Sequence, residues 1–114
     1  MVVLGAVAAA LPAIVELIWG GRHVNFTGTL HFYSVGISAL VATAAAAGLT
    51  VIGARRGDTR TVVIGTAFAV MASLLALHGF STPGIVVGDN GVIAFTGGAT
   101  LPAGAVILAF SSFT

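Results

Sequence analysis

The chain has 114 residues, of which 58% are hydrophobic and only 6% are Asp, Glu, Lys or Arg, whereas a soluble domain carries about 25% charged residues. The net charge of +1, with no basic cluster interleaved with aromatic residues, excludes a nucleic-acid partner. The lack of cysteine excludes disulfides, thiolate metal sites and cysteine nucleophiles.

The apolar runs predict an all-α integral membrane protein. A helix needs about 20 residues to cross the bilayer, and lipid offers no partners to backbone polar groups. We expect one domain over residues 1–114, a bundle of four transmembrane helices with both termini in the cytoplasm. The expected spans cover residues 2–20, 31–54, 61–80 and 92–110.

The first expected span, residues 2–20, contains the small-residue pattern Ala6-Val7-Ala8, which resembles a signal-peptide cleavage site. A basic leader is missing and the apolar stretch continues past Pro12, so we expect a retained membrane helix. Polar and glycine residues at 21–30 predict a loop. The second span, residues 31–54, has an Ala- and Gly-rich centre, which allows close helix approach.

Three of the four basic residues lie in the connection Arg55-Arg56-Gly57-Asp58-Thr59-Arg60. The positive-inside rule therefore predicts that this connection is cytoplasmic.

The third span, residues 61–80, ends at Ser81-Thr82-Pro83-Gly84, and Asp89-Asn90-Gly91 predicts a turn before the fourth. Inside the fourth span, residues 92–110, stand Gly97, Gly98, Pro102 and Gly104. We expect this helix to be kinked or locally broken. The chain is then either a small membrane subunit or the front end of a longer protein.

Ionisable residues inside a bilayer are costly and are functional candidates by default. Glu16, His31 and His78 all fall at the extracytoplasmic ends of their predicted spans, with His23 and Asp89 in loops on that side. Imidazole and carboxylate bind transition metals, and two imidazoles ligate haem. These three residues are therefore candidate metal ligands, and a transition metal or haem is the candidate cofactor.

The predicted depths of His31 and His78 in the membrane restrict the metal sites that the two residues can form. Counted from the connection at 55–60, His31 lies roughly 9 Å further out than His78 at about 1.5 Å per residue. Neighbouring helix axes about 8 to 10 Å apart then place the two α-carbons roughly 12 to 13 Å from each other. That separation is too wide for a compact tetrahedral site without tilt, and near the limit for two imidazoles on one haem iron.

Each candidate also has a structural interpretation. His31 beside Phe32 and Tyr33 fits an interfacial aromatic belt, and His78 fits a hydrogen-bonded tie between helices. Glu16 is either protonated or paired. Ser34 and Ser38 follow His31 at helical spacing and extend a polar stripe that suits a ligand-lined groove or interhelical hydrogen bonds.

The motifs His31-Phe32, Arg55-Arg56-Gly57-Asp58 and Leu77-His78-Gly79-Phe80-Ser81-Thr82-Pro83-Gly84 resemble the multi-spanning amino-terminal regions of bacterial signalling proteins. Those regions precede HAMP, nucleotide-cyclase or diguanylate-cyclase domains. The resemblance implies a sensory module in a bacterial inner or plasma membrane and gives weight to His31 and to residues 78–84.

No catalytic motif is present, so we do not expect an enzyme. The leading hypothesis is a noncatalytic sensory or regulatory module whose extracytoplasmic Glu/His pocket binds a metal, haem, quinone or other small ligand. The alternative is an accessory or assembly subunit of a larger membrane complex. Transport or proton relay is weaker, because no polar residue continues the path to the cytoplasmic side. The expected partners are the lipid bilayer and either further copies of the chain or other membrane subunits.

Overall fold

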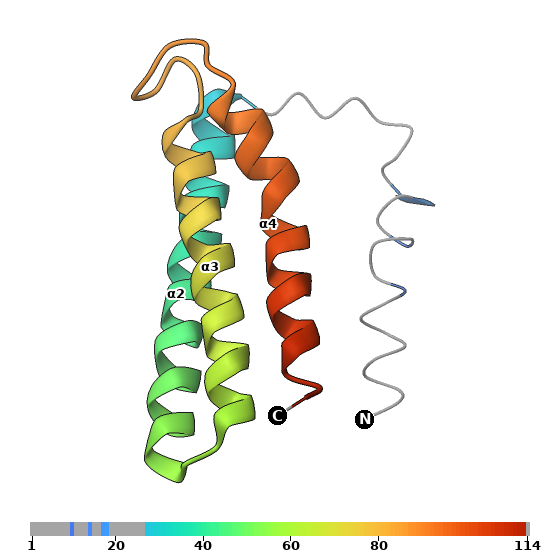
Figure 1. Cartoon of the computed structure of the whole chain (residues 1–114). Coiled ribbons are helices and arrows are strands. Elements are labelled where there is room, and N and C mark those ends of the chain that lie inside the picture. Colours follow the sequence, from blue (N-terminus) through green and yellow to red (C-terminus); the bar gives the residue numbers. More distant parts are fainter. Residues whose placement is uncertain (1–9, 11–13, 15–16, 19–26, 114) are drawn as a thin grey trace.

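The computed structural model describes residues 10, 14, 17, 18 and 27–113. It is all-α, and its long helices are α2 (Gly28–Arg56), α3 (Thr59–Phe80) and α4 (Val92–Phe110) (Figure 1). Each of the three is long and apolar enough to cross a membrane. These helices are the architecture of an integral membrane protein.

The expected bundle of four transmembrane helices is corrected to three helices in the part of the chain that the structure describes. The predicted span over residues 2–20 lies outside the described residues apart from four isolated positions. Hydropathy identifies a run that prefers lipid, but membership of a bundle depends on side-chain packing, which composition does not encode. The cytoplasmic placement of both termini depended on that count of four and is withdrawn with it.

A tight connection joins α2 to α3. Gly57 adopts a left-handed conformation with φ 65°, and its N–H donates to the Ala54 carbonyl while the Asp58 N–H donates to the Gly53 carbonyl. This is a Schellman C-cap, and glycine adopts its left-handed φ without a Cβ clash. The Asp58 carboxylate then caps α3 by accepting from the Thr61 N–H at 3.2 Å. Only Gly57 and Asp58 separate the two helices, so the expected six-residue connection is mostly helix.

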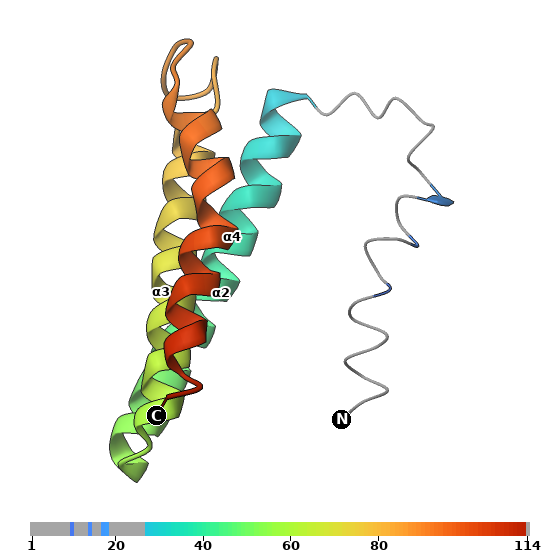
Figure 2. The same cartoon turned by 45° about the vertical axis from the view of Figure 1, so that its right-hand side comes forward.

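Helix α3 is the central helix. It packs against α2 and against α4, whereas no Cα atoms of α2 and α4 lie within 8 Å of each other. Small residues allow the close approaches: a Cβ on Gly65 would lie 2.9 Å from the Thr50 nitrogen, and one on Gly79 would lie 3.3 Å from Val35 Cγ1. The α2 axis also runs obliquely to α3 and α4 (Figure 2).

Helix α4 runs through Pro102 as one continuous helix, so of the two predicted alternatives, a kink or a local break, the local break is wrong. A proline removes one backbone donor, but neighbouring helices and Ser/Thr side chains allow membrane helices to accommodate it. The Thr100 hydroxyl, two residues before Pro102, donates to the Thr96 carbonyl at 2.7 Å.

Residues 81–91 connect α3 to α4 and lie at the same end of the bundle as the start of α2 (Figure 1). The Asn90 amide donates to the Ser81 carbonyl at 3.1 Å and to the Gly88 carbonyl at 2.8 Å, and its Oδ1 accepts from the Val92 N–H at 3.0 Å. One asparagine therefore ties the loop to the end of α3 and satisfies the backbone N–H of Val92 at the start of α4.

Candidate functional site

The structure brings His31 of α2 and His78 of α3 together at this end of the bundle. Their Nε2 atoms are 3.1 Å apart, and the ring centroids are 5.1 Å apart with the planes inclined at 67°. Both residues are only partly buried. The pair is a direct side-chain contact between two membrane-length helices.

The surroundings of His78 define its tautomer. Its Nδ1 lies 2.8 Å from the Ile93 carbonyl oxygen, and a carbonyl can only accept a hydrogen bond. Nδ1 therefore carries the proton, and Nε2 of the neutral ring is left with its lone pair facing His31. It follows that His31 is the donor of the Nε2···Nε2 hydrogen bond.

Two residues of α4 shape the space around His78. The Thr96 side chain is almost fully buried, and its hydroxyl donates to the Val92 carbonyl at 2.7 Å while lying 3.3 Å from His78 Nδ1. Gly97 faces the imidazole, because a Cβ there would lie 3.0 Å from Cε1 and 3.2 Å from Nδ1. The first turns of α4 therefore form the packing surface against which the His78 ring lies.

His31, His78 and Ile93 together form a chain of hydrogen bonds across all three helices. Because α2 and α4 do not pack against each other, this chain links them through α3. A hollow of about 420 Å³ lies between α2 and α4, next to the histidine pair. Its walls come from α2, α3 and α4 and are almost entirely apolar apart from His78 and Thr100.

Of the other predicted site residues, those that the structure describes do not join the pair. The hydroxyls of Ser34 and Ser38 are exposed and donate to carbonyls of their own helix, those of Leu30 and Ser34, each at 2.8 Å. Glu16 and His23 lie outside the described residues. Asp89 is exposed in the 81–91 loop. Across residues 27–113 and the four isolated positions, no group of three or more His, Asp or Glu residues is arranged to hold a metal ion.

Haem does not fit between the two rings. Two axial nitrogens on opposite sides of one metal at about 2.0 to 2.1 Å each would be about 4 Å apart, which exceeds the observed 3.1 Å. One residue further along α3, a Cβ on Gly79 would lie 3.3 Å from Val35 Cγ1 of α2. The helices are therefore too close at this level to admit a macrocycle.

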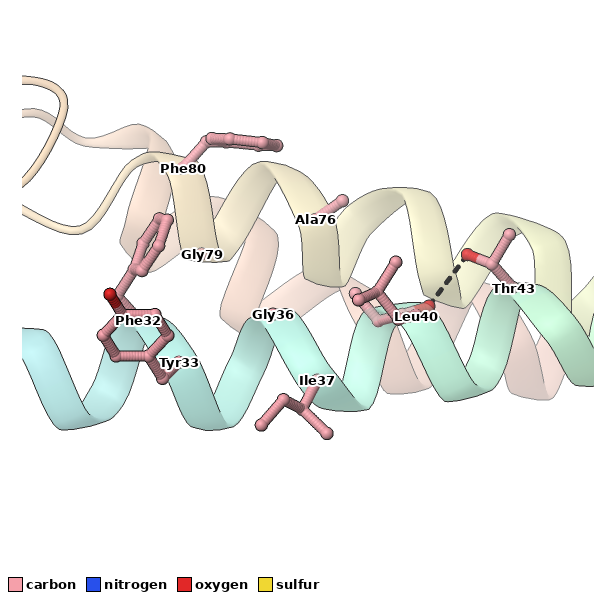
Figure 3. Close-up of a pocket in the computed structure, with 10 residues that line it drawn as sticks. Phe32, Tyr33, Gly36, Ile37, Leu40, Thr43, Ala76, Gly79 and Phe80 are labelled. Carbon is pink, nitrogen blue, oxygen red and sulfur yellow. Dashed lines mark hydrogen bonds between the residues drawn. The ribbon is translucent and has the colours of Figure 1, made fainter.

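An apolar groove runs along the crevice between α2 and α3 (Figure 3). Phe32 and Phe80 meet edge to face at one end of it, with ring centroids 6.2 Å apart. Its volume is about 350 Å³, and the Thr43 hydroxyl in its lining is already bonded to the Ala39 carbonyl at 2.8 Å. The groove therefore offers shape and apolar contact, with few polar groups to orient a ligand.

Sequence reasoning identified both histidines but missed their partners on α4. Two sequence features could have indicated Thr96 and Gly97: the threonines four residues apart at 96 and 100, and the pair Gly97-Gly98. The Ile93 carbonyl has no signal in the sequence, because every residue carries one. Comparison with protein-family models, curated proteins and solved structures found no match to this chain.

Proposed function

We propose that the chain is a noncatalytic sensory or regulatory membrane module whose helix packing is controlled at the His31–His78 pair. The observation that carries the proposal is the hydrogen-bonded chain from His31 through His78 to the Ile93 carbonyl. A ligand that binds one packing state more tightly than another shifts the population toward that state. A ligand at this pair acts on a side-chain contact between α2 and α3 that continues to α4.

The orientation in the membrane is part of the same proposal. Arg55 and Arg56 stand in the last turn of α2, and Arg60 stands in the first turn of α3. The positive-inside rule assigns this end to the cytoplasm. The histidine pair lies near the opposite ends of α2 and α3, so it would report conditions at the extracytoplasmic face of a bacterial membrane.

A reporter disulfide tests the proposal, because the chain has no cysteine of its own. A Cβ on Gly79 would lie 3.8 Å from the Val35 Cβ, which is the average Cβ separation, about 3.8 Å, in disulfides. The variant Val35→Cys/Gly79→Cys should cross-link under mild oxidation in membrane vesicles. Adding His31→Ala or His78→Ala should slow the cross-linking severalfold, whereas Ser38→Ala should leave it unchanged. Equal rates in all four proteins would rule out control of packing by the pair.

A second candidate function is an accessory subunit of a membrane complex, with the groove between α2 and α3 receiving a transmembrane helix of a partner protein. Small residues in the lining, including Gly36 and Gly79, permit close helix approach (Figure 3). A side chain at Gly36 meets open space, so Gly36→Leu fills the groove without disturbing the fold. Gly48 is equally open but lies outside the groove. In mild-detergent purification, Gly36→Leu should lose a bound partner that Gly48→Leu retains.

A further inference from the structure

We infer that the His31–His78 pair binds a divalent transition-metal ion of the class that imidazole prefers, such as Zn²⁺, Ni²⁺ or Cu²⁺. The inference deepens the proposed function and rests on it, since it names the chemical class of the ligand that controls the packing. It depends on three features of the pair: the tautomer of His78, the separation of the two Nε2 atoms, and the connection to α4.

The hydrogen bonding of His78 leaves its Nε2 available to bind a metal ion. The Ile93 carbonyl holds the proton on Nδ1 and leaves the Nε2 lone pair available. Histidines bound to metals almost always donate their other ring N–H to a carbonyl, a carboxylate or water, which sets the tautomer and orients the ring. The Thr96 hydroxyl, 3.3 Å from Nδ1, and Gly97, which makes room for the ring, complete this support from α4.

The separation of the two nitrogens suits one shared ion. Two nitrogens 3.1 Å apart, each about 2.0 to 2.1 Å from a metal, subtend an angle of about 100° at that metal. This value falls between the right angles of octahedral or square-planar sites and the tetrahedral angle of zinc. The ion therefore needs no change in the distance between the two Nε2 atoms, and each ring turns so that its lone pair points at the ion instead of at the other nitrogen.

Metal binding replaces one hydrogen bond with two coordinate bonds. His31 changes tautomer to bind the ion: its Nε2 loses a proton to solvent and its Nδ1 takes one up from solvent, so a neutral pair releases no net proton. Within the described residues no third His, Asp or Glu accompanies the pair, so the protein ligands that the structure supplies are the two imidazoles.

The closing experiment is Zn²⁺ titration calorimetry on the full chain in detergent micelles, purified with a tag free of histidine. Cu²⁺ electron paramagnetic resonance gives a second readout, because coordinated nitrogen splits the signal. We expect about one ion per chain and no comparable binding of Mg²⁺. His31→Ala and His78→Ala should each weaken binding at least about tenfold, whereas Ser38→Ala, which removes a hydroxyl bonded to a carbonyl of its own helix, should not.

His31→Gln removes the ligand but keeps a side-chain N–H that can donate to His78 Nε2, so we expect this variant to fold; an amide is a poor partner for these ions. Loss of Zn²⁺ binding in this variant, with unchanged helix content, supports the inference. Zn²⁺ binding equal to the parent in His31→Gln and in both alanine variants overturns it, as does binding no stronger than that of Mg²⁺.

The two proposals fail in different ways. If Zn²⁺ does not bind, but the Val35→Cys/Gly79→Cys cross-link still depends on His31 and His78, the metal inference is wrong and the control of packing stands. If Zn²⁺ binds through both histidines and leaves the cross-linking rate unchanged, the metal site stands and the proposed function is wrong.

Discussion

Gly97 of α4 faces the imidazole of His78 of α3, and a single methyl group at Gly97 would lie 3.0 Å from Cε1 and 3.2 Å from Nδ1. The ring therefore occupies space that only a glycine leaves open. The neighbouring Gly98 faces open space, and a Cβ there contacts nothing within 4 Å. A comparison of substitutions at Gly97 and Gly98 therefore distinguishes a steric clash with His78 from the general effect of replacing a glycine in this helix.

Gly97→Ala should displace the His78 ring and weaken its hydrogen bond to the Ile93 carbonyl. Overpacking of this kind costs about 1 to 3 kcal/mol. Gly98→Ala, the matched control, should be neutral or slightly stabilising because alanine is the better helix former. Reversible unfolding in mixed detergent micelles measures both. Equal stability of the two variants would show that the His78 ring does not pack against Gly97.

The contact between α2 and α3 at Gly65 should be equally intolerant of a side chain. A Cβ at Gly65 would lie 2.9 Å from the Thr50 backbone nitrogen, which cannot move without separating the helices. Gly65→Ala should therefore lower the free energy of unfolding by about 1 to 3 kcal/mol.

Gly104→Ala is a graded comparison for Gly65→Ala, because the obstacle there is the flexible Met71 side chain. Methionine has three rotatable bonds and adapts to new shapes. The loss of stability should therefore be smaller than in Gly65→Ala, and Gly48→Ala should cost nothing because its surroundings are open. The same unfolding measurement ranks the three variants, and the reverse order would contradict this account of helix packing.

Asp58 should make the start of α3 sensitive to acid. The hydrogen bond from the Thr61 side chain, followed by that from the Thr61 backbone N–H, holds the pKa of the Asp58 carboxyl below its ordinary value. A lowered pKa in the folded state stabilises the protein above the ordinary value, and this stabilisation is lost as the pH falls through the folded-state pKa. Amide exchange in the first turn of α3, divided by the intrinsic exchange rate at each pH, should therefore accelerate in that acidic range.

Two substitutions separate the charge of Asp58 from its capping role. Asp58→Ala removes the cap and should raise exchange in the first turn of α3 at neutral pH as well. Asp58→Asn retains a capping oxygen, since asparagine is as good an N-cap as aspartate, but it cannot titrate. Its exchange should be near that of the parent at neutral pH and should lack the acid-dependent rise. A rise of equal size in Asp58→Asn would contradict the assignment.

The apolar runs of the sequence were sufficient to locate the membrane-length helices. The fourth expected span, residues 92–110, coincides with α4 (Val92–Phe110), because turn residues mark its start. The second and third spans were placed a few residues short. Arginines at the end of a helix satisfy its dipole and remain helical, and Asp58 caps the next helix within one residue of the turn. The structure describes three of the four expected spans, and the expected local break at Pro102 does not form.

The contact between His31 and His78 is closer than residue counts along two separate helices predict. An axial offset of roughly 9 Å, at about 1.5 Å per residue, assumes helices parallel to one another, whereas α2 runs obliquely to α3 (Figure 2). Each imidazole also places its Nε2 well away from its own backbone, so two histidines bridge a gap that looks wide between α-carbons. The role of the Ile93 carbonyl depends on the packing of α4 against α3, which neither composition nor periodicity contains.

The energetic coupling between His31 and His78 tests the central claim most directly. A double-mutant cycle compares the unfolding free energies of the parent, His31→Ala, His78→Ala and the double variant, with Ser34→Ala replacing His31→Ala in a control cycle. We predict a coupling of about 0.5 to 1.5 kcal/mol for the histidine pair, as for a hydrogen bond between partly buried groups, and none for the control. Additive effects of the two histidine substitutions would contradict a contact that joins α2 to α3.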